Sequence, residues 1–203
     1  VTWTVTDNAG NTTTCSQVVT VTDDQAPTAS NPAAITVECA ADVPAADPTV
    51  VTDEADNCTT NPTVAFVSDV SDNASNPETI TRTYSVTDEA GNSINVIQTI
   101  TVEDTQAPTI TCPADVSVVA DAGECTASGV ALGTPTTSDN CGVASVTNDA
   151  PATFPLGDTT VTWTVTDNAG NTTTCSQVVT VTDDQAPTIT CPADVSVVAD
   201  AGE

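Results

Sequence analysis

The sequence has almost no positive charge. Its 203 residues contain one arginine, no lysine, no histidine and 28 Asp or Glu residues, for a formal net charge of −27 at pH 7. Binding to nucleic acid requires a basic surface that meets the phosphates, and anionic membrane surfaces attract the same basic surface. The composition therefore excludes both partners and favours divalent cations. The alternative interpretation is that acidity only keeps a long polymer soluble and self-repelling.

Aromatic residues, long apolar runs and helical periodicity are also lacking. Aromatics make up 2% of the residues, so any core must consist of Val, Ile, Ala and Leu. No run of 18 apolar residues occurs, so no membrane insertion is expected of this segment. High charge with few aromatics is typical of disorder, but the regular alternation described below predicts an ordered β fold.

The cysteines lack the neighbouring ligands that a zinc site requires. There are eight of them, no histidine, and no CxxC spacing, so a structural zinc site is not expected. Disulfides are the better interpretation, and they indicate an oxidising, extracytoplasmic location.

What the sequence does contain is a repeat. The segment VTWTVTDNAGNTTTCSQVVTVTDDQAPT spans 1–28 and returns without change at 161–188, with a looser copy at 82–109. A second identical pair, QAPTITCPADVSVVADAGE, spans 106–124 and 185–203. Repetition at a fixed period predicts an array of similar domains.

The repeat sets the domain boundaries. Two whole units occupy 25–104 and 105–183. The C-terminal strands of one further unit occupy 1–24, and the first strand of another occupies 184–203. The organisation is that expected of a window cut from a longer tandem chain. Copies of the chain cannot complete each other into a whole domain, because 1–24 and 184–203 together lack the equivalent of 125–160.

Apolar and polar residues alternate along the repeat. In VTWTVT, Val161, Trp163 and Val165 face one way and the intervening threonines the other, which is the pattern of a half-buried strand. The DNAGN sequence that follows predicts a tight hairpin turn. Further strands are predicted in DVSVVA, GVAL, GVASVT and ATF. About seven short strands in about 80 residues predict an all-β fold of tandem immunoglobulin-like antiparallel β-sandwiches, arranged as a rod.

The cysteine positions predict disulfide pairs. Asn31 and Val96 occupy, in the first whole unit, the positions of Cys112 and Cys175, so both members of one pair vanish together. This predicts a Cys112–Cys175 bridge and, by elimination, Cys125–Cys141 and Cys39–Cys58. If the strand after Cys125 ran the height of the domain, the elimination would fail, because no disulfide spans more than ~7 Å between Cα atoms. Cys15 and Cys191 are expected to pair with residues outside the window.

The carboxylates gather at three kinds of place. In an immunoglobulin-like topology, three segments lie at the N-terminal end of a domain. They are the junction between domains, the loop that contains the sequence DNC (56–58 and 139–141, the DNC loop) and the DNAGN hairpin. A hard cation such as calcium, which takes several oxygen ligands, would relieve the repulsion there. The alternative is that Asp and Asn are simply good turn residues. The candidate calcium ligands are Asp23, Asp24, Asp53, Asp56, Asp88, Glu103, Asp104, Asp139, Asn140, Asp167, Asp183 and Asp184.

The second whole unit resembles a hyalin repeat (HYR), an extracellular immunoglobulin-like module. The resemblance is carried by the CP opening at Cys112, the FPLGDTTVTWTVTD run at 154–167 and the DNAGN turn before Cys175. The first unit departs from it at Asn31 and Val96 and lacks FPLG. Tandem arrays of this kind are similar to the stalks of large bacterial surface adhesins, including those of Bacteroidetes. The resemblance implies a cell-surface or secreted adhesin, or an extracellular fibre.

Three classes of function are considered for this chain. The first is a structural segment of an adhesin stalk or filament, stiffened by disulfides and by calcium at domain junctions. Its partners are neighbouring repeats, with lateral self-association as a further expectation. The alternative is a carbohydrate- or ice-binding module, but sugar sites use exposed aromatics, and twisted strands offer only short threonine rows. An enzyme is not expected, because histidine and lysine are absent and no nucleophile motif occurs.

Overall fold

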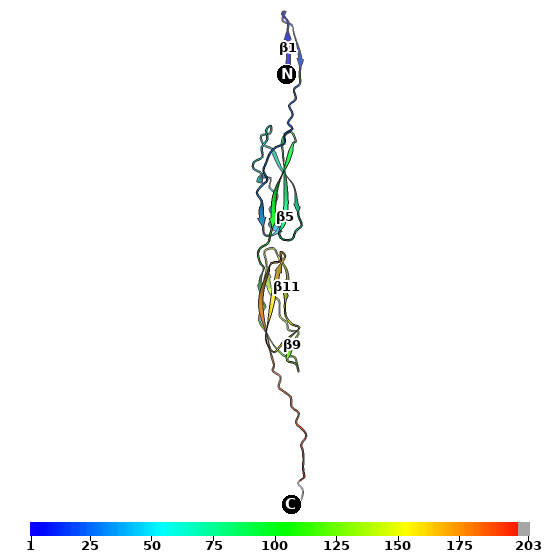
Figure 1. The fold of residues 1–203 in the computed structure, drawn as a ribbon, viewed down its shortest axis with the longest axis vertical. Helices are drawn as coiled ribbons and strands as arrows, with labels where there is room; N and C mark the ends of the chain where they lie inside the picture. The colour runs from blue at the N-terminus through cyan, green and yellow to red at the C-terminus, as the bar shows by residue number, and fades with distance from the viewer. Residues whose placement is uncertain (199–203) are drawn as a thin grey trace. The chain divides into compact units, whose positions relative to one another are not determined.

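The structure is a computed structural model, and it describes residues 1–198. The chain divides into two compact units, Val1–Thr105 and Gln106–Glu203, which are described separately. Within the described residues nearly all regular structure is β-strand, with two short 3-10 turns at Ala40–Asp42 (η1) and Pro48–Val50 (η2) (Figure 1). The all-β, immunoglobulin-like fold class predicted from the alternation is therefore confirmed.

One four-stranded sheet organises the first unit. Its strand order is β3-β6-β5-β4. Strands β3 and β6 run parallel, whereas the pairs β6–β5 and β5–β4 are antiparallel. A parallel pairing between an early strand and the last strand is the feature that closes an immunoglobulin-like sandwich at its edge. The strands are β3 (Ile35–Val37), β4 (Thr63–Ser71), β5 (Glu78–Thr87) and β6 (Ser93–Val102).

The core of the first unit is built from alternate residues of these strands. Tyr84 and Val86 of β5 pack with Val96 of β6 and with Val51. The Tyr84 hydroxyl accepts a hydrogen bond of 3.2 Å from the backbone N–H of Asp47, which satisfies its polar end. Phe66 is half-exposed and meets Tyr84 edge to face, with ring centroids 6.4 Å apart.

The second unit contains a similar four-stranded sheet and two small ribbons. The sheet order is β11-β13-β14-β8, with β14 and β8 parallel. The ribbons pair β7 with β10 and β9 with β12. The strands are β7 (Thr109–Thr111), β8 (Val116–Val119), β9 (Thr126–Ser128), β10 (Thr136–Ser138), β11 (Val143–Asn148), β12 (Thr153–Pro155), β13 (Gly157–Asp167) and β14 (Thr172–Thr182).

Alternation along β13 defines the core of the second unit. Val161, Trp163 and Val165 are buried, as predicted, and Val161 and Trp163 pack with Phe154 and with valines of β14. The predicted strand over GVAL is wrong: the extended segment lies earlier, at β9 (Thr126–Ser128), and Gly129 follows it with φ +61°. A residue in the left-handed region interrupts a strand.

The remaining strands form a hairpin at the start of the chain, drawn in blue in Figure 1. It consists of β1 (Thr2–Thr6) and β2 (Thr12–Ser16), with Trp3 opposite Cys15. Residues 17–22 and 184–198 form no strand, although strands were expected there. In the second unit, the segments of the same sequence are strands because they pair with each other. Residues 199–203 of the predicted last strand lie outside the described residues.

No helix within residues 1–198 has the length and apolar character needed to cross a membrane.

Candidate metal centre

Three carboxylates converge at one end of the first unit. Asp23 comes from the DDQAP segment, Asp56 from the loop before β4, and Asp88 from the turn between β5 and β6. Each offers an oxygen atom, and these three atoms lie within 4.8 Å of one another. The junction segment, the DNC loop and the hairpin thus meet in this unit, as the sequence predicts.

Local hydrogen bonds fix the orientation of two of these side chains. Oδ2 of Asp56 accepts hydrogen bonds from the backbone N–H groups of Cys58 (2.8 Å) and Thr59 (2.7 Å). Asp88 accepts two from Asn92, one from its backbone and one from its side chain, each 2.8 Å. Burial opposes ionisation of Asp88, but the hydrogen bonds from Asn92 and neighbouring backbone groups outweigh it, so the pKa of Asp88 lies below its ordinary value. Asp88 is therefore ionised at neutral pH.

Asn92 also ties the junction segment to this turn. Its side-chain nitrogen lies 3.2 Å from the backbone oxygen of Asp23 and donates to Oδ2 of Asp88. Oδ1 of Asp23 in turn accepts from the backbone N–H of Gln25 at 3.1 Å. Asn92 was not among the predicted site residues. The sequence feature that could have identified Asn92 is its place as the last residue of the AGN turn, which recurs in each repeat.

Two carboxylate oxygens in this cluster are buried and have no hydrogen-bond partner. They are Oδ2 of Asp23 and Oδ1 of Asp56. Buried polar atoms are nearly always paired, and these two oxygens are free to accept a bond from a cation or from a donor group. Arg82 is the only basic side chain in the sequence. It forms a bidentate ion pair with Asp69, with two hydrogen bonds of 2.8 Å, and not with this cluster.

The thiol of Cys58 borders the same cluster. Partial burial and the negative charges of Asp23, Asp56 and Asp88 raise the pKa of this thiol. A raised pKa keeps the sulfur protonated near neutral pH, so it adds no further charge to the three carboxylates.

The second unit repeats two members of the arrangement. Oδ2 of Asp139 accepts from the backbone N–H groups of Cys141 and Gly142, each at 2.8 Å, while its Oδ1 is buried without a partner. Oδ1 of Asp167 accepts from the backbone N–H groups of Ala169, Gly170 and Asn171. Carboxylate oxygens of Asp139 and Asp167 lie within 4.8 Å of each other. The DNC loop and the hairpin therefore adopt the same geometry in both units.

The structure places the other predicted ligands as follows. Asp53 accepts from the backbone N–H of Ser30, and Asp183 from that of Gln185. Asp104 is buried, and its backbone N–H donates to Oδ1 of Asn76. Glu103 is half-buried at the end of β6 and donates from its backbone to Val37. The remaining predicted ligands, all exposed, are Asp24, Asn140 and Asp184.

The disulfide between Cys112 and Cys175 is confirmed. Their Cα atoms lie 5.8 Å apart, and the bridge links the start of the second unit to β14. In the first unit, Asn31 stands where Cys112 stands in the second. Its Oδ1 accepts a 2.8 Å hydrogen bond from the backbone N–H of Ile97, so a hydrogen bond replaces the covalent link there.

The bridges Cys39–Cys58 and Cys125–Cys141, predicted by elimination, are wrong, because Cys58 and Cys125 are free thiols. Cys58 borders the turn before β6, whereas Cys39 follows β3, whose Val37 pairs with Val102 at the far end of β6. A ten-residue strand separates these two ends by about 30 Å at ~3.3 Å per residue. The same distance argument applies to Cys125 and Cys141, which lie near opposite ends of β14.

The fold, the repeat and the disulfide define the chain as a tandem of immunoglobulin-like β-sandwich domains. Residues 103–181 match the family model described as HYR domain, and residues 27–102 match the HYR-like domain with 4 cysteines. Residues 27–181 therefore belong to the HYR family, as a HYR-like domain followed by a HYR domain. The first of these departs from its family's description, because it contains only Cys39 and Cys58. No curated protein matches the chain.

HYR domains are adhesion-type repeats, typically extracellular or on the cell surface, and they serve as structural rather than catalytic domains.

Proposed function

We propose that this chain is a structural segment of a long extracellular adhesin stalk or surface fibre, with calcium at the domain junctions. The observation that carries the proposal is the convergence of Asp23, Asp56 and Asp88, whose oxygens lie within 4.8 Å of one another. Asp23 belongs to the segment that enters the domain, while the other two belong to its loops. A cation held by all three would fix the direction in which the chain enters.

The chemistry of the cluster suits calcium. All the offered ligands are oxygens, and Ca²⁺ takes six to eight oxygen ligands in flexible geometry. The two buried oxygens without a donor, on Asp23 and Asp56, provide negative charge that no side chain of the protein compensates. Backbone carbonyls and water would complete the coordination, as is usual for calcium in proteins.

The same carboxylates recur in the next repeat, so the proposal applies to further junctions of the chain. Asp104 is the sequence counterpart of Asp23, and Asp139 and Asp167 are the counterparts of Asp56 and Asp88. Asp183 repeats the junction residue once more. We therefore expect one calcium for each junction that has all three carboxylates.

A repeated, rigid element suits a spacer better than a specific binding module. Of the five aromatic side chains on which a sugar could stack, Tyr84, Trp163 and Phe154 are buried in cores, while Trp3 and Phe66 are exposed. The disulfide Cys112–Cys175 adds stability to a small domain in an oxidising environment. Neighbouring repeats of the same chain are then the natural partners of each domain.

Calcium titration of the full chain by calorimetry tests the proposal. Asp56→Asn should reduce the number of bound calcium ions by one, because it removes a negative ligand while keeping the size of the side chain. Asp24→Asn is the matched control, since it makes the same charge change beside Asp23 at an exposed position. Equal calcium binding by the two variants would show that the cluster is a set of turns, and the metal part of the proposal would fail.

A further inference from the structure

Besides the outer disulfide of the second domain, each of the two whole domains carries one cysteine near each of its ends. Cys58 and Cys141 belong to the DNC loops, at the end where the chain enters the domain. Cys39 and Cys125 lie near the opposite end, where the chain leaves it. Because the height of the domain separates the two ends, neither domain can join its own pair. A disulfide that uses one of these cysteines must therefore reach another domain.

Cys39 lies where the chain leaves the first domain. It follows β3, whose Val37 pairs with Val102, the last residue of β6. The side chain of Glu38 accepts a 2.9 Å hydrogen bond from the backbone N–H of Thr105. Cys39 is thus the sequence neighbour of a residue that is bonded to the last residue of the first unit.

Cys141 lies where the chain enters the second domain. The first strand of this unit, β7, begins at Thr109, which pairs with Ser138 of β10. The hydroxyl of Thr109 also donates to the carbonyl oxygen of Ser138 at 2.9 Å. Cys141 follows in the same loop, and its carbonyl oxygen accepts a 3.1 Å hydrogen bond from the side chain of Asn168. The DNC loop is therefore held beside the segment that opens the unit.

The continuity of the chain links these two ends. Thr105 is the last residue of the first unit, and Gln106, the next residue, is the first of the second. The segment 103–108 between β6 and β7 can span no more than about 20 Å, at ~3.3–3.6 Å per residue. The two ends of one domain, by contrast, are about 30 Å apart along β6. Cys39 therefore has a shorter route to the DNC loop of the next domain than to that of its own.

The oxidation states of the cysteines agree with this route. Within residues 1–198, the free thiols are Cys15, Cys58, Cys125 and Cys191. Cys39 and Cys141 are not among them, because each is disulfide-bonded. Cys112, which lies near the start of the second unit, is bonded to Cys175.

We propose that Cys39 and Cys141 form a disulfide between the two consecutive domains. The bond between the sulfur atoms forms when the two thiols lose two protons and two electrons to a small-molecule disulfide, which is reduced to two thiols. The bridge joins the end of the first domain to the start of the second, in parallel with the peptide chain. It needs no cation, so it is independent of the calcium site.

Two covalent links at one junction restrict the rotation of one domain relative to the other. They also share a force that pulls along the chain, which suits a segment of a stalk or fibre. Calcium and the bridge would stiffen the same junction by separate means. Reduction together with chelation should therefore loosen this junction more than chelation alone.

The single arginine of the chain provides a direct test. Trypsin cleaves after Lys and Arg, so in denaturant it cuts this chain only after Arg82, into 1–82 and 83–203. A Cys39–Cys141 bridge joins these two fragments, whereas the outer disulfide of the second domain lies within the second fragment. A non-reducing gel of the cut chain therefore separates an interdomain bridge from bridges inside one domain.

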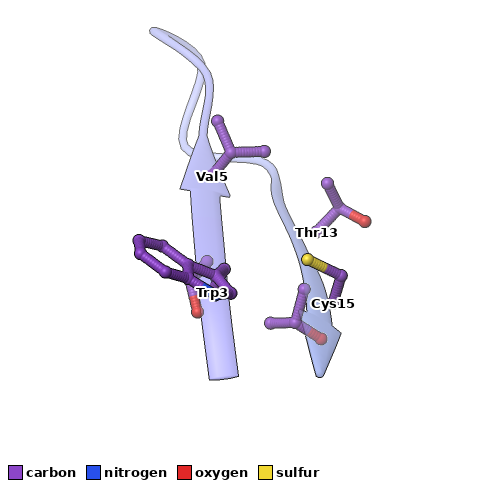
Figure 2. Close-up of a pocket in the computed structure, with 6 residues that line it drawn as sticks. Trp3, Val5, Thr13 and Cys15 are labelled. Carbon is purple, nitrogen blue, oxygen red and sulfur yellow. The ribbon is translucent and has the colours of Figure 1, made fainter. Parts of the chain in front are cut away.

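The free thiols must be blocked before the chain is unfolded, so that disulfides do not exchange. All four are exposed, and Cys15, for example, lines an open pocket with Trp3 and Val5 (Figure 2), where a small alkylating reagent can reach it. After alkylation of the folded chain, the cut wild type should run as one species without reductant and as two with it. The mass of the linked peptides should identify Cys39 and Cys141.

Serine variants separate this pair from the free thiols. Cys39→Ser and Cys141→Ser should each give two separate fragments without reductant. Cys58→Ser and Cys125→Ser are the matched controls, because each removes a free thiol from the same domains, and they should leave the fragments linked. The double variant C39S/C141S should keep wild-type hydrogen exchange along β5 and β13, because the bridge lies between the domains and not within a core.

Several results would overturn the inference. Separate fragments from the alkylated wild type would rule out the bridge, and so would a linked peptide in which Cys39 has any other partner. Covalent dimers of the uncut chain would show that the bond joins two copies. Faster exchange along β5 or β13 in the double variant would place the bond within a domain.

Discussion

The indole nitrogen of Trp163 donates a 3.1 Å hydrogen bond to Oε1 of Gln177, and both side chains are buried. The amide nitrogen of Gln177 donates in turn to the carbonyl oxygens of Ala114 (2.7 Å) and Leu132 (2.9 Å). One buried amide thus connects β13 and β14 with two loop segments of the second unit. In the first unit, Gln98 donates likewise to the carbonyl oxygen of Ala33.

Gln177→Leu should destabilise the second unit by on the order of 2–4 kcal/mol. The substitution introduces an apolar side chain of similar size and leaves the Trp163 N–H and two carbonyl oxygens without partners. Thermal unfolding followed through the buried tryptophan measures the effect. Gln17→Leu, at the same position of the exposed hairpin, is the matched control and should leave the unfolding temperature of the unit unchanged.

Replacing both Cys112 and Cys175 by Ser should lower the stability of the second unit by about 2–4 kcal/mol, because a cross-link across 63 residues is lost. Hydrogen exchange should become faster along β13 and stay unchanged along β5 of the first unit. Cys125→Ser removes a free thiol and serves as the control. Equal loss of protection in both units would contradict the assignment of this bridge to one domain.

Acid should weaken the hairpin of the second unit through Asp167. Burial opposes ionisation of this carboxyl, but hydrogen bonds from Asn171, Gly170 and Ala169 outweigh it and hold its pKa below the ordinary 3.8. A lowered pKa contributes stability that is fully present above the unfolded value and is lost as pH falls through the folded value.

Urea unfolding of wild type and Asp167→Asn between pH 7 and pH 2 measures this contribution. The difference in unfolding free energy between the two should be largest at neutral pH and shrink as the pH falls below about 4. Asp184→Asn, at an exposed position, should follow wild type at every pH. A difference that does not depend on pH would mean that the charge of Asp167 plays no part.

The sequence predicts the parts of this fold that depend on alternation. Val161, Trp163 and Val165 were assigned to the core because polar residues separate them, and all three are buried. The convergence of Asp23, Asp56 and Asp88 also followed, because an immunoglobulin-like topology brings the junction and these loops to one end.

Other features could not be predicted because they depend on distance and contact. Pairing Cys39 with Cys58 by elimination ignored the length of the strand between the two ends of the domain. Residues 17–22 have the sequence of a strand and form none, since a strand needs a neighbour with which to pair. The polar side chain of Gln177 interrupts an apolar pattern, and only its contacts identify it as a core residue.

Small-angle scattering of the full chain, with calcium and then with chelator, measures whether calcium stiffens the domain junctions. We expect an extended particle in calcium whose range of end-to-end distances widens on chelation, because the carboxylates then repel and release the junctions. Asp56→Asn should show part of this widening even in calcium, and Asp24→Asn should not. Identical scattering with calcium and with chelator would contradict calcium-stiffened junctions and leave the acidic loops as turns.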